Sequence, residues 1–148
     1  MLKFEGIVGS RSSKEGAPRG PVGEAEILTL NPQRRTAILA ATGWKDLFPG
    51  TLNLEVGQEV VEGLLSCSPL IREKGEDVKY PEPYTHIPKL RVGYLYYQAS
   101  IRGGDRSASV LIRRAINPLP RRVEAFAEAR LREMLSLSDG DRVICEVS

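Results

Sequence analysis

Residues 48–56 read FPGTLNLEV, a turn followed by a segment of strict alternation. Pro49-Gly50 favours a tight turn, because proline fixes its own φ and glycine tolerates conformations closed to other residues. After the turn, apolar residues at 52, 54 and 56 alternate with polar or charged residues at 51, 53 and 55. This period of two predicts a half-buried strand over residues 51–56.

The segment before this turn predicts a helix. Asn31 is a good N-cap, and Pro32 suits the first helical position because its missing N–H would be unpaired there anyway. The helix should run to about Thr42 and stop at Gly43. Three apolar residues form its expected inward stripe: Ala37, Ile38 and Ala41.

The first thirty residues predict a strand, a long loop and a short extended stretch. Leu2–Gly9 has the apolar weight of a strand, residues 10–23 lack periodicity, and residues 24–30 are extended. The loop can cradle phosphates through backbone N–H groups and cations, although its composition fits a plain solvated loop equally well. Its candidate phosphate ligands are Ser10, Arg11, Ser12, Lys14 and Gly16.

Beyond the alternating strand, the chain predicts more strands. Gln58–Leu65 is predicted as a weaker strand, and Cys67–Lys89 as a polar, proline-rich excursion that could act as a lid. Leu90–Ile101 and Ser107–Arg114 should form a hairpin around the turn sequence at residues 103–105.

The C-terminal part predicts one helix and a last strand. Residues 138–141 read as a turn, and Arg142–Val147 as a strand that buries Cys145 on its inner face. The expected elements are mostly strands, with one helix before the alternating strand and one near the C-terminus. This order favours a mainly β fold, and a small closed barrel over a doubly wound sheet. Five apolar residues at helical spacing indicate the late helix: Val123, Ala127, Leu131, Met134 and Leu135.

Length and composition are those of one soluble globular domain spanning residues 1–148. The net charge of +2 argues against a protein that coats nucleic acid. The absence of a signal-peptide pattern and of an apolar run of about 20 residues predicts a cytoplasmic protein without a membrane span. The P-loop motif is absent, and the single histidine, His86, excludes a two-histidine metal centre.

The turn and the alternating strand also carry the best candidate chemistry. Gly50 allows close approach of a ligand to the backbone, while Thr51 and Asn53 project their oxygens to the same side. A hydroxyl and an amide carbonyl suit Mg²⁺, which takes its charge balance from substrate phosphates. The alternative is a turn whose Thr and Asn satisfy local backbone groups.

Residues 43–54, with Gly43-Trp44 and Pro49-Gly50-Thr51-Leu52-Asn53, resemble the archaeal-type CTP-dependent riboflavin kinase family. Residues 5–10 resemble its opening strand, and the hairpin over residues 90–114 resembles its second half. Residues 131–143, LREMLSLSDGDRV, resemble its terminal helix and strand, a motif that swapped-hairpin transcription factors also carry.

The resemblance implies a cradle-loop (RIFT-like) six-stranded barrel that transfers the γ-phosphate of CTP to the 5′-hydroxyl of riboflavin, giving FMN. Carried over by position, Thr51 and Asn53 would hold Mg²⁺, and Glu124 would be the base. The nucleotide phosphates would be bound by the loop residues named above and by Gly50.

The chain departs from the family after Ser10, where two glycines of its S-G-x-G-E-G run are replaced. Side-chain cations could substitute for these backbone donors, or the nucleotide could differ. Two alternatives therefore stand beside the kinase: a barrel that binds a nucleotide or other phosphorylated ligand without turnover, and a DNA-binding regulator of the swapped-hairpin type.

Overall fold

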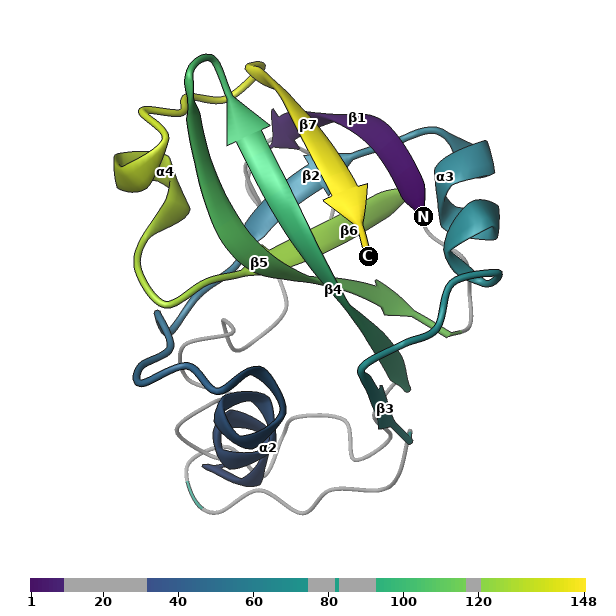
Figure 1. The fold of residues 1–148 in the computed structure, drawn as a ribbon, viewed down its shortest axis with the longest axis vertical. Helices are drawn as coiled ribbons and strands as arrows, with labels where there is room; N and C mark the ends of the chain where they lie inside the picture. The colour runs from purple at the N-terminus through teal and green to yellow at the C-terminus, as the bar shows by residue number, and fades with distance from the viewer. Residues whose placement is uncertain (10–31, 75–81, 83–92, 117–120) are drawn as a thin grey trace.

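The computed structural model describes residues 1–9, 32–74, 82, 93–116 and 121–148. Strands dominate these residues, and the few helices lie around them (Figure 1). The strands are β1 (Leu2–Gly9), β2 (Leu52–Glu55), β3 (Ile71–Glu73), β4 (Tyr94–Gly103), β5 (Arg106–Ala115), β6 (Arg122–Phe126) and β7 (Arg142–Val147). The helices are α2 (Pro32–Thr42), α3 (Gln58–Leu64) and α4 (Leu131–Met134).

Six of the strands close into an antiparallel barrel, as the sequence predicted. The order runs β4-β5-β6-β2-β1-β7, and a further pairing of β7 with β4 closes the ring. The short strand β3 pairs with the start of β4 outside this ring. Because β1 and β7 are neighbours, the two chain ends lie side by side (Figure 1).

Alternation along the strands fills the barrel interior. In β2, Leu52 and Leu54 point inward, and Val123 and Ala125 do the same in β6. Tyr97 of β4 is fully buried in the same cluster. This apolar core is what a small closed barrel requires, because its interior has room for side chains alone.

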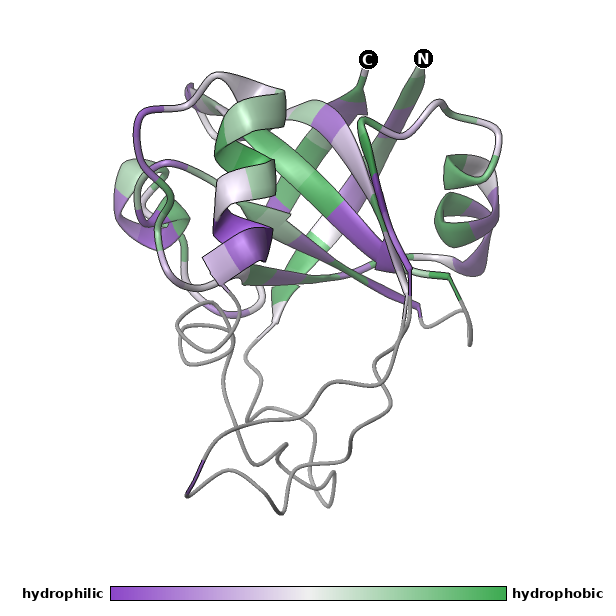
Figure 2. Ribbon diagram, turned by 90° about the horizontal axis from the view of Figure 1, so that it is seen from below, coloured by the Kyte–Doolittle hydropathy of each residue, from purple (hydrophilic) through white to green (hydrophobic). Residues whose placement is uncertain are grey.

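A second apolar cluster lies outside the barrel, between α2 and the sheet. Figure 2 shows α2 lying over the strands on this side. Ile38 of the helix packs with Tyr96, Leu111 and Phe126, whose side chains leave the outer face of the sheet. The predicted inward stripe of α2 was wrong in two of its three positions. Arg34 is buried beside Ile38, whereas Ala37 and Ala41 are exposed.

Several predicted elements are confirmed. Strand β1 and the last strand β7 have the predicted bounds, and α2 ends at Thr42. Gly43 follows with φ +74°, a conformation that favours glycine, and its N–H donates to the carbonyl of Leu39 at 2.9 Å. The hairpin is also present, with the turn at Gly104-Asp105.

The prediction of a strand over Gln58–Leu65 was wrong, because this segment is helix α3. Its buried residues are Val60, Val61 and Leu64, which share one helical face at spacings of one, three and four. The valines favoured a strand in isolation, but the barrel offers a wall for a helical face here.

The predicted helical spacing from Val123 to Leu135 was also misleading. Residues 122–126 form β6, in which Val123 and Ala125 face the barrel interior, and α4 covers Leu131–Met134 alone. The excursion at residues 67–89 contains β3, while residues 75–81 and 83–89 lie outside the described part of the chain. No described helix is long and apolar enough to cross a membrane.

Candidate functional site

A row of strand partners crosses the outer face of the barrel. Gly9 of β1 pairs with Asn53 of β2, Asn53 pairs with Glu124 of β6, and Glu124 pairs with Arg113 of β5. Directly opposite residues on one sheet face have Cβ atoms about 4.5–5.5 Å apart. The register therefore brings one predicted metal ligand and the predicted base side by side, at the strand end from which the predicted phosphate loop departs.

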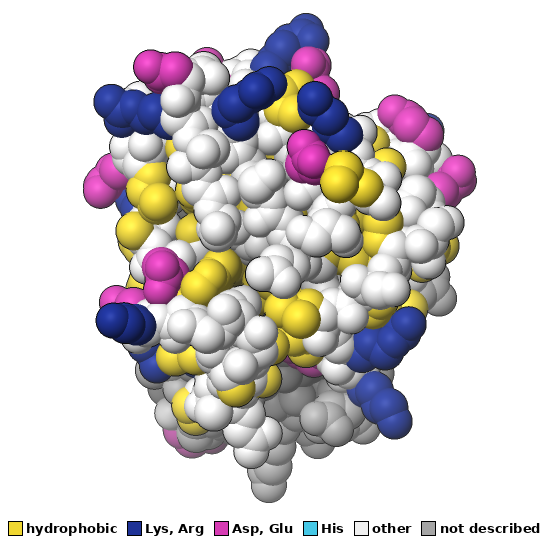
Figure 3. Space-filling view, viewed as in Figure 1, with side chains coloured by type: hydrophobic (Ala, Val, Ile, Leu, Met, Phe, Trp, Pro, Cys, Tyr) yellow, Lys and Arg dark blue, Asp and Glu magenta, His cyan; other side chains and the backbone are white. Residues whose placement is uncertain are grey.

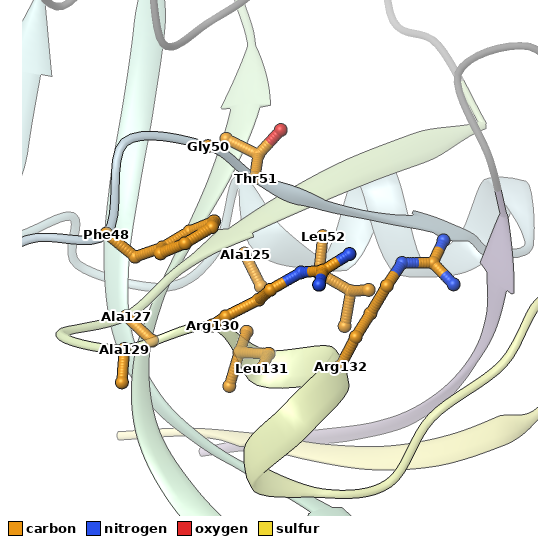
Figure 4. A pocket seen from close by; sticks show the side chains of 10 residues that line it. All are labelled: Phe48, Gly50, Thr51, Leu52, Ala125, Ala127, Ala129, Arg130, Leu131 and Arg132. Atoms are coloured by element: carbon orange, nitrogen blue, oxygen red, sulfur yellow. The ribbon is translucent and has the colours of Figure 1, made fainter.

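The two predicted metal ligands share a side of the chain. Leu52 and Leu54 are buried in the barrel, so Asn53 between them projects from the outer face. Thr51 precedes the strand, and its hydroxyl points away from Leu52 and Leu131 (Figure 4). Thr51 and Asn53 are both half-buried, which leaves their oxygens within reach of a ligand.

Glu124 lies in a strand and not at the start of a helix. Its Oε2 accepts a hydrogen bond from Nη2 of Arg113 in an ion pair. The Glu124 side chain is 19% exposed and that of Arg113 only 3%. The nearby Glu128 has a separate role, because its Oε1 accepts the backbone N–H of Lys45 at 2.9 Å.

A pocket of about 260 Å³ opens at the barrel end beside this row (Figure 4). Phe48 forms one wall, held by its N–H bond to the carbonyl of Ala127 at 2.9 Å. Gly50 lies against the ring, since a Cβ added at Gly50 would be 3.0 Å from Cε2 of Phe48. The full lining is Phe48, Gly50, Thr51, Leu52, Ala125, Ala127, Ala129, Arg130, Leu131 and Arg132.

Two arginines give this pocket its charge. Arg130 is half exposed and lies 3.3 Å from Glu133. Nη2 of Arg132 donates to Asp139 at 2.6 Å and to the carbonyl of Gly9 at 3.4 Å. Guanidinium groups beside the origin of the predicted phosphate loop are suited to phosphate oxygens.

Sequence reasoning did not assign a role to these arginines or to Arg113. Arg132 lies within residues 131–143, the segment that resembles the family's terminal helix and strand, and this resemblance could have pointed to it. Nothing in the local sequence singled out Arg130. Arg113 could have been suspected because Arg113-Arg114 interrupts an apolar strand. Its pairing with Glu124, however, depends on strand register.

The predicted phosphate-binding residues fall into two groups. Gly50 lines the pocket. Ser10, Arg11, Ser12, Lys14 and Gly16 lie outside the described residues, so their predicted role stays a prediction.

The donor set around Asn53 fits a divalent cation that shares its ligands with a substrate. No cluster of three Asp, Glu, His or Cys side chains suited to a metal occurs in the described part of the chain. Thr51 and Asn53 supply two neutral oxygens, with the Glu124 carboxylate in the adjacent strand position. Mg²⁺ accepts such a sparse set when phosphates and waters complete its octahedron.

The outer cluster continues from Arg113 toward α2. Tyr96 donates its hydroxyl to Glu73 at 2.8 Å, and Arg34 pairs with the same carboxylate at 2.5 Å. Burial raises the pKa of Tyr96 above its usual value, and the nearby cations of Arg113 and Arg34 offset part of that rise. The tyrosine therefore stays protonated and serves as a hydrogen-bond donor.

The fold is that of a small, mainly β barrel, and the candidate site lies at the end of β1, beside the pocket that contains the two arginines. A family model for CTP-dependent riboflavin kinases, described as a domain of unknown function (DUF120), matches residues 22–147. The match covers most of the chain, and the chain belongs to this family. No curated protein matches the chain.

Proposed function

We propose that the protein transfers the γ-phosphate of CTP to the 5′-hydroxyl of riboflavin, giving FMN and CDP. The observation that supports this proposal is the strand register Gly9–Asn53–Glu124, which brings a proposed metal ligand beside a proposed base, next to the residue that precedes the predicted phosphate loop. The family membership supplies the nucleotide and the flavin.

In this proposal, the chain binds and orients the reactants while few side chains take part in bond making. The 5′-oxygen forms a bond to the γ-phosphorus, the bond from that phosphorus to the bridging oxygen of CDP breaks, and Glu124 accepts the hydroxyl proton. Phosphoryl transfer depends mainly on positioning and charge neutralisation, so this set of groups is sufficient.

The divalent cation, which we assign as Mg²⁺, would be held by Thr51 and Asn53. When bound, it neutralises phosphate charge and orients the transferring group. Arg130 and Arg132 would add positive charge at the pocket beside it. Phe48 and Leu52 form an apolar wall on which the flat cytosine ring of CTP can pack.

The direct test is to incubate the protein with riboflavin, Mg²⁺ and each nucleoside triphosphate in turn and to separate flavins by chromatography. FMN formed with CTP is the expected result. Riboflavin and CTP binding without any FMN would favour the non-catalytic barrel, and a lack of product and binding with every donor would contradict both.

A further inference from the structure

The side chain opposite Glu124 on β5 is held from several directions. Arg113 is 3% exposed. Its guanidinium carbon lies 4.3 Å from the ring centroid of Tyr94 and 4.8 Å from that of Phe126. Cation–π contacts at these distances restrict the plane and the position of the guanidinium group. Arg113 is therefore a fixed point on the outer face of the barrel.

The two oxygens of the Glu124 carboxylate have different surroundings. Oε2 accepts the N–H of Arg113, whereas Oε1 has no hydrogen-bond partner among the residues that the structure describes. The strand register brackets this carboxylate between Arg113 on β5 and Asn53 on β2. One oxygen is thus anchored, and the other is available beside the predicted metal ligand.

We propose that Arg113 is a positioning residue for phosphoryl transfer: it anchors Oε2 of Glu124 so that Oε1 accepts the proton of the substrate hydroxyl. This inference rests on the proposed function. A glutamate side chain has several rotatable bonds, and a general base must lie within about 2.6–3.2 Å of the group it deprotonates. A buried guanidinium with a fixed orientation selects the productive rotamer before the flavin binds.

A double-mutant cycle measured in kcat tests this role. Arg113→Met and Glu124→Gln should each lower kcat by about 10²-fold or more, the scale of a lost general base. Since Arg113 acts through Glu124, the double variant should fall within about twofold of Glu124→Gln alone. A merely structural role of Arg113 predicts instead that the two losses multiply, which would overturn the inference.

Two further variants separate positioning from disruption of the fold. Arg113→Lys keeps the charge but loses the planar fork, and it should recover part of the kcat lost in Arg113→Met. Arg34→Met removes another buried ion pair, Arg34–Glu73, from the same outer cluster, and it serves as the matched control. Its kcat should stay near that of the wild type, and an equal loss in Arg34→Met would contradict the inference.

The double variant also protects the test against misfolding. Arg113→Met alone leaves Glu124 without its cation, but the double variant removes both charges and avoids a half-buried unpaired carboxylate. The Michaelis constant for CTP should remain close to the wild-type value in all these variants, because Arg113 does not line the nucleotide pocket. A large rise in that constant with unchanged kcat would point to a role in nucleotide binding and against positioning.

Failure of the proposed function gives a different pattern. If the wild type binds riboflavin but forms no FMN with any donor, the proposed function fails. The same double-mutant cycle is then measured in the Kd of riboflavin, which quenching of its fluorescence reports. Coupled losses of affinity would then still support the Arg113–Glu124 unit, and independent losses would overturn it. A wild type that binds no riboflavin contradicts both proposals.

Discussion

Asn53 is the residue at which the candidate site converges. Its neighbours across the sheet are Gly9 on one side and Glu124 on the other, and its own strand buries Leu52 and Leu54. The buried leucines fix the direction in which Asn53 projects, because a slip of one residue would exchange the two faces of the strand. The position of the amide oxygen is thus a consequence of the barrel core.

Asn53→Leu tests this residue directly. The change keeps the approximate size of the side chain and removes the amide oxygen, so kcat/KM for FMN formation should fall by about 10²-fold. The magnesium concentration that gives half-maximal activity should rise in parallel. Glu55→Gln, two residues further on β2 and exposed, is the matched control and should behave as the wild type. Equal activity of Asn53→Leu and the wild type would remove Asn53 from the site.

The two cysteines differ in accessibility and should differ in reactivity. Cys67 is half-buried, whereas Cys145 is fully buried, and burial raises the pKa of the Cys145 thiol from 9.0 to about 12. Because the thiolate is the reactive form, Cys145 should resist alkylation in the native state. Titration with a disulfide reagent at pH 8 should modify Cys67 first and Cys145 only after denaturation. Rapid modification of both thiols in the native protein would contradict the assigned burial.

At the scale of elements, local sequence predicted those whose signals are local. A few adjacent residues determine each of these elements: Pro32 and Gly43 at the two ends of α2, the alternation in β2, and the turn of the β4–β5 hairpin. Helix α3 and strand β6 were mispredicted, because Val60-Val61 and the residues around Val123 fit either periodicity. Tertiary contacts decide their structure: α3 packs against the outside of the barrel, and β6 is held between β5 and β2 within it.

The same limit applies to the candidate site. Thr51 and Asn53 could be singled out because both lie in one short motif. The Arg113–Glu124 pair could not be read from the sequence, since it requires the register between β5 and β6. The pocket formed by Phe48, Arg130 and Arg132 likewise requires the turn before β2 to meet the start of α4.

Helix α3 offers a test at this scale. Glu62 is exposed in the helix, so Glu62→Pro would remove an N–H bond and introduce a clash with the preceding turn. We expect a loss of about 3 kcal/mol in the free energy of unfolding, measured with urea. Glu62→Ala, the control, should change it by less than about 0.5 kcal/mol. Near-equal stabilities of the two variants would contradict a helix at residues 58–64.

In the whole molecule, barrel closure through β4 and β7 holds the row of paired residues Gly9, Asn53, Glu124 and Arg113 in place. Each strand of the row Gly9–Asn53–Glu124–Arg113 is paired on both sides, so no member stands on a free sheet edge. On the face shown in Figure 3, the described basic and acidic side chains are interspersed and form no continuous basic stripe. This face therefore lacks the charge pattern of a nucleic-acid surface.

The buried thiol of Cys145 and the buried phenol of Tyr96 predict how the stability of the protein depends on pH. Burial raises the pKa of Cys145 to about 12 and raises that of Tyr96, so the folded state keeps protons that the unfolded state loses. Their stabilisation is complete below pH 9, the ordinary pKa of the thiol, and is lost as the pH rises above it.

Above pH 9, titration of Cys145 should lower the free energy of unfolding by roughly 1 kcal/mol for each pH unit. Urea unfolding at several pH values between 7 and 11 measures it. Cys145→Ala should reduce this slope, although it lowers the stability at pH 7 through the lost packing. An unchanged slope in Cys145→Ala would show that the thiol titrates normally.

We propose that phosphoryl transfer takes place at the row formed by Gly9, Asn53 and Glu124. A crystal structure with CDP, Mg²⁺ and FMN tests it most directly. We predict a metal about 2.1 Å from the oxygens of Thr51 and Asn53, with the FMN phosphate beside Glu124 and CDP in the pocket of Arg130 and Arg132. A nucleotide bound elsewhere on the barrel, with Asn53 remote from the metal, would show that the reaction does not take place at this row.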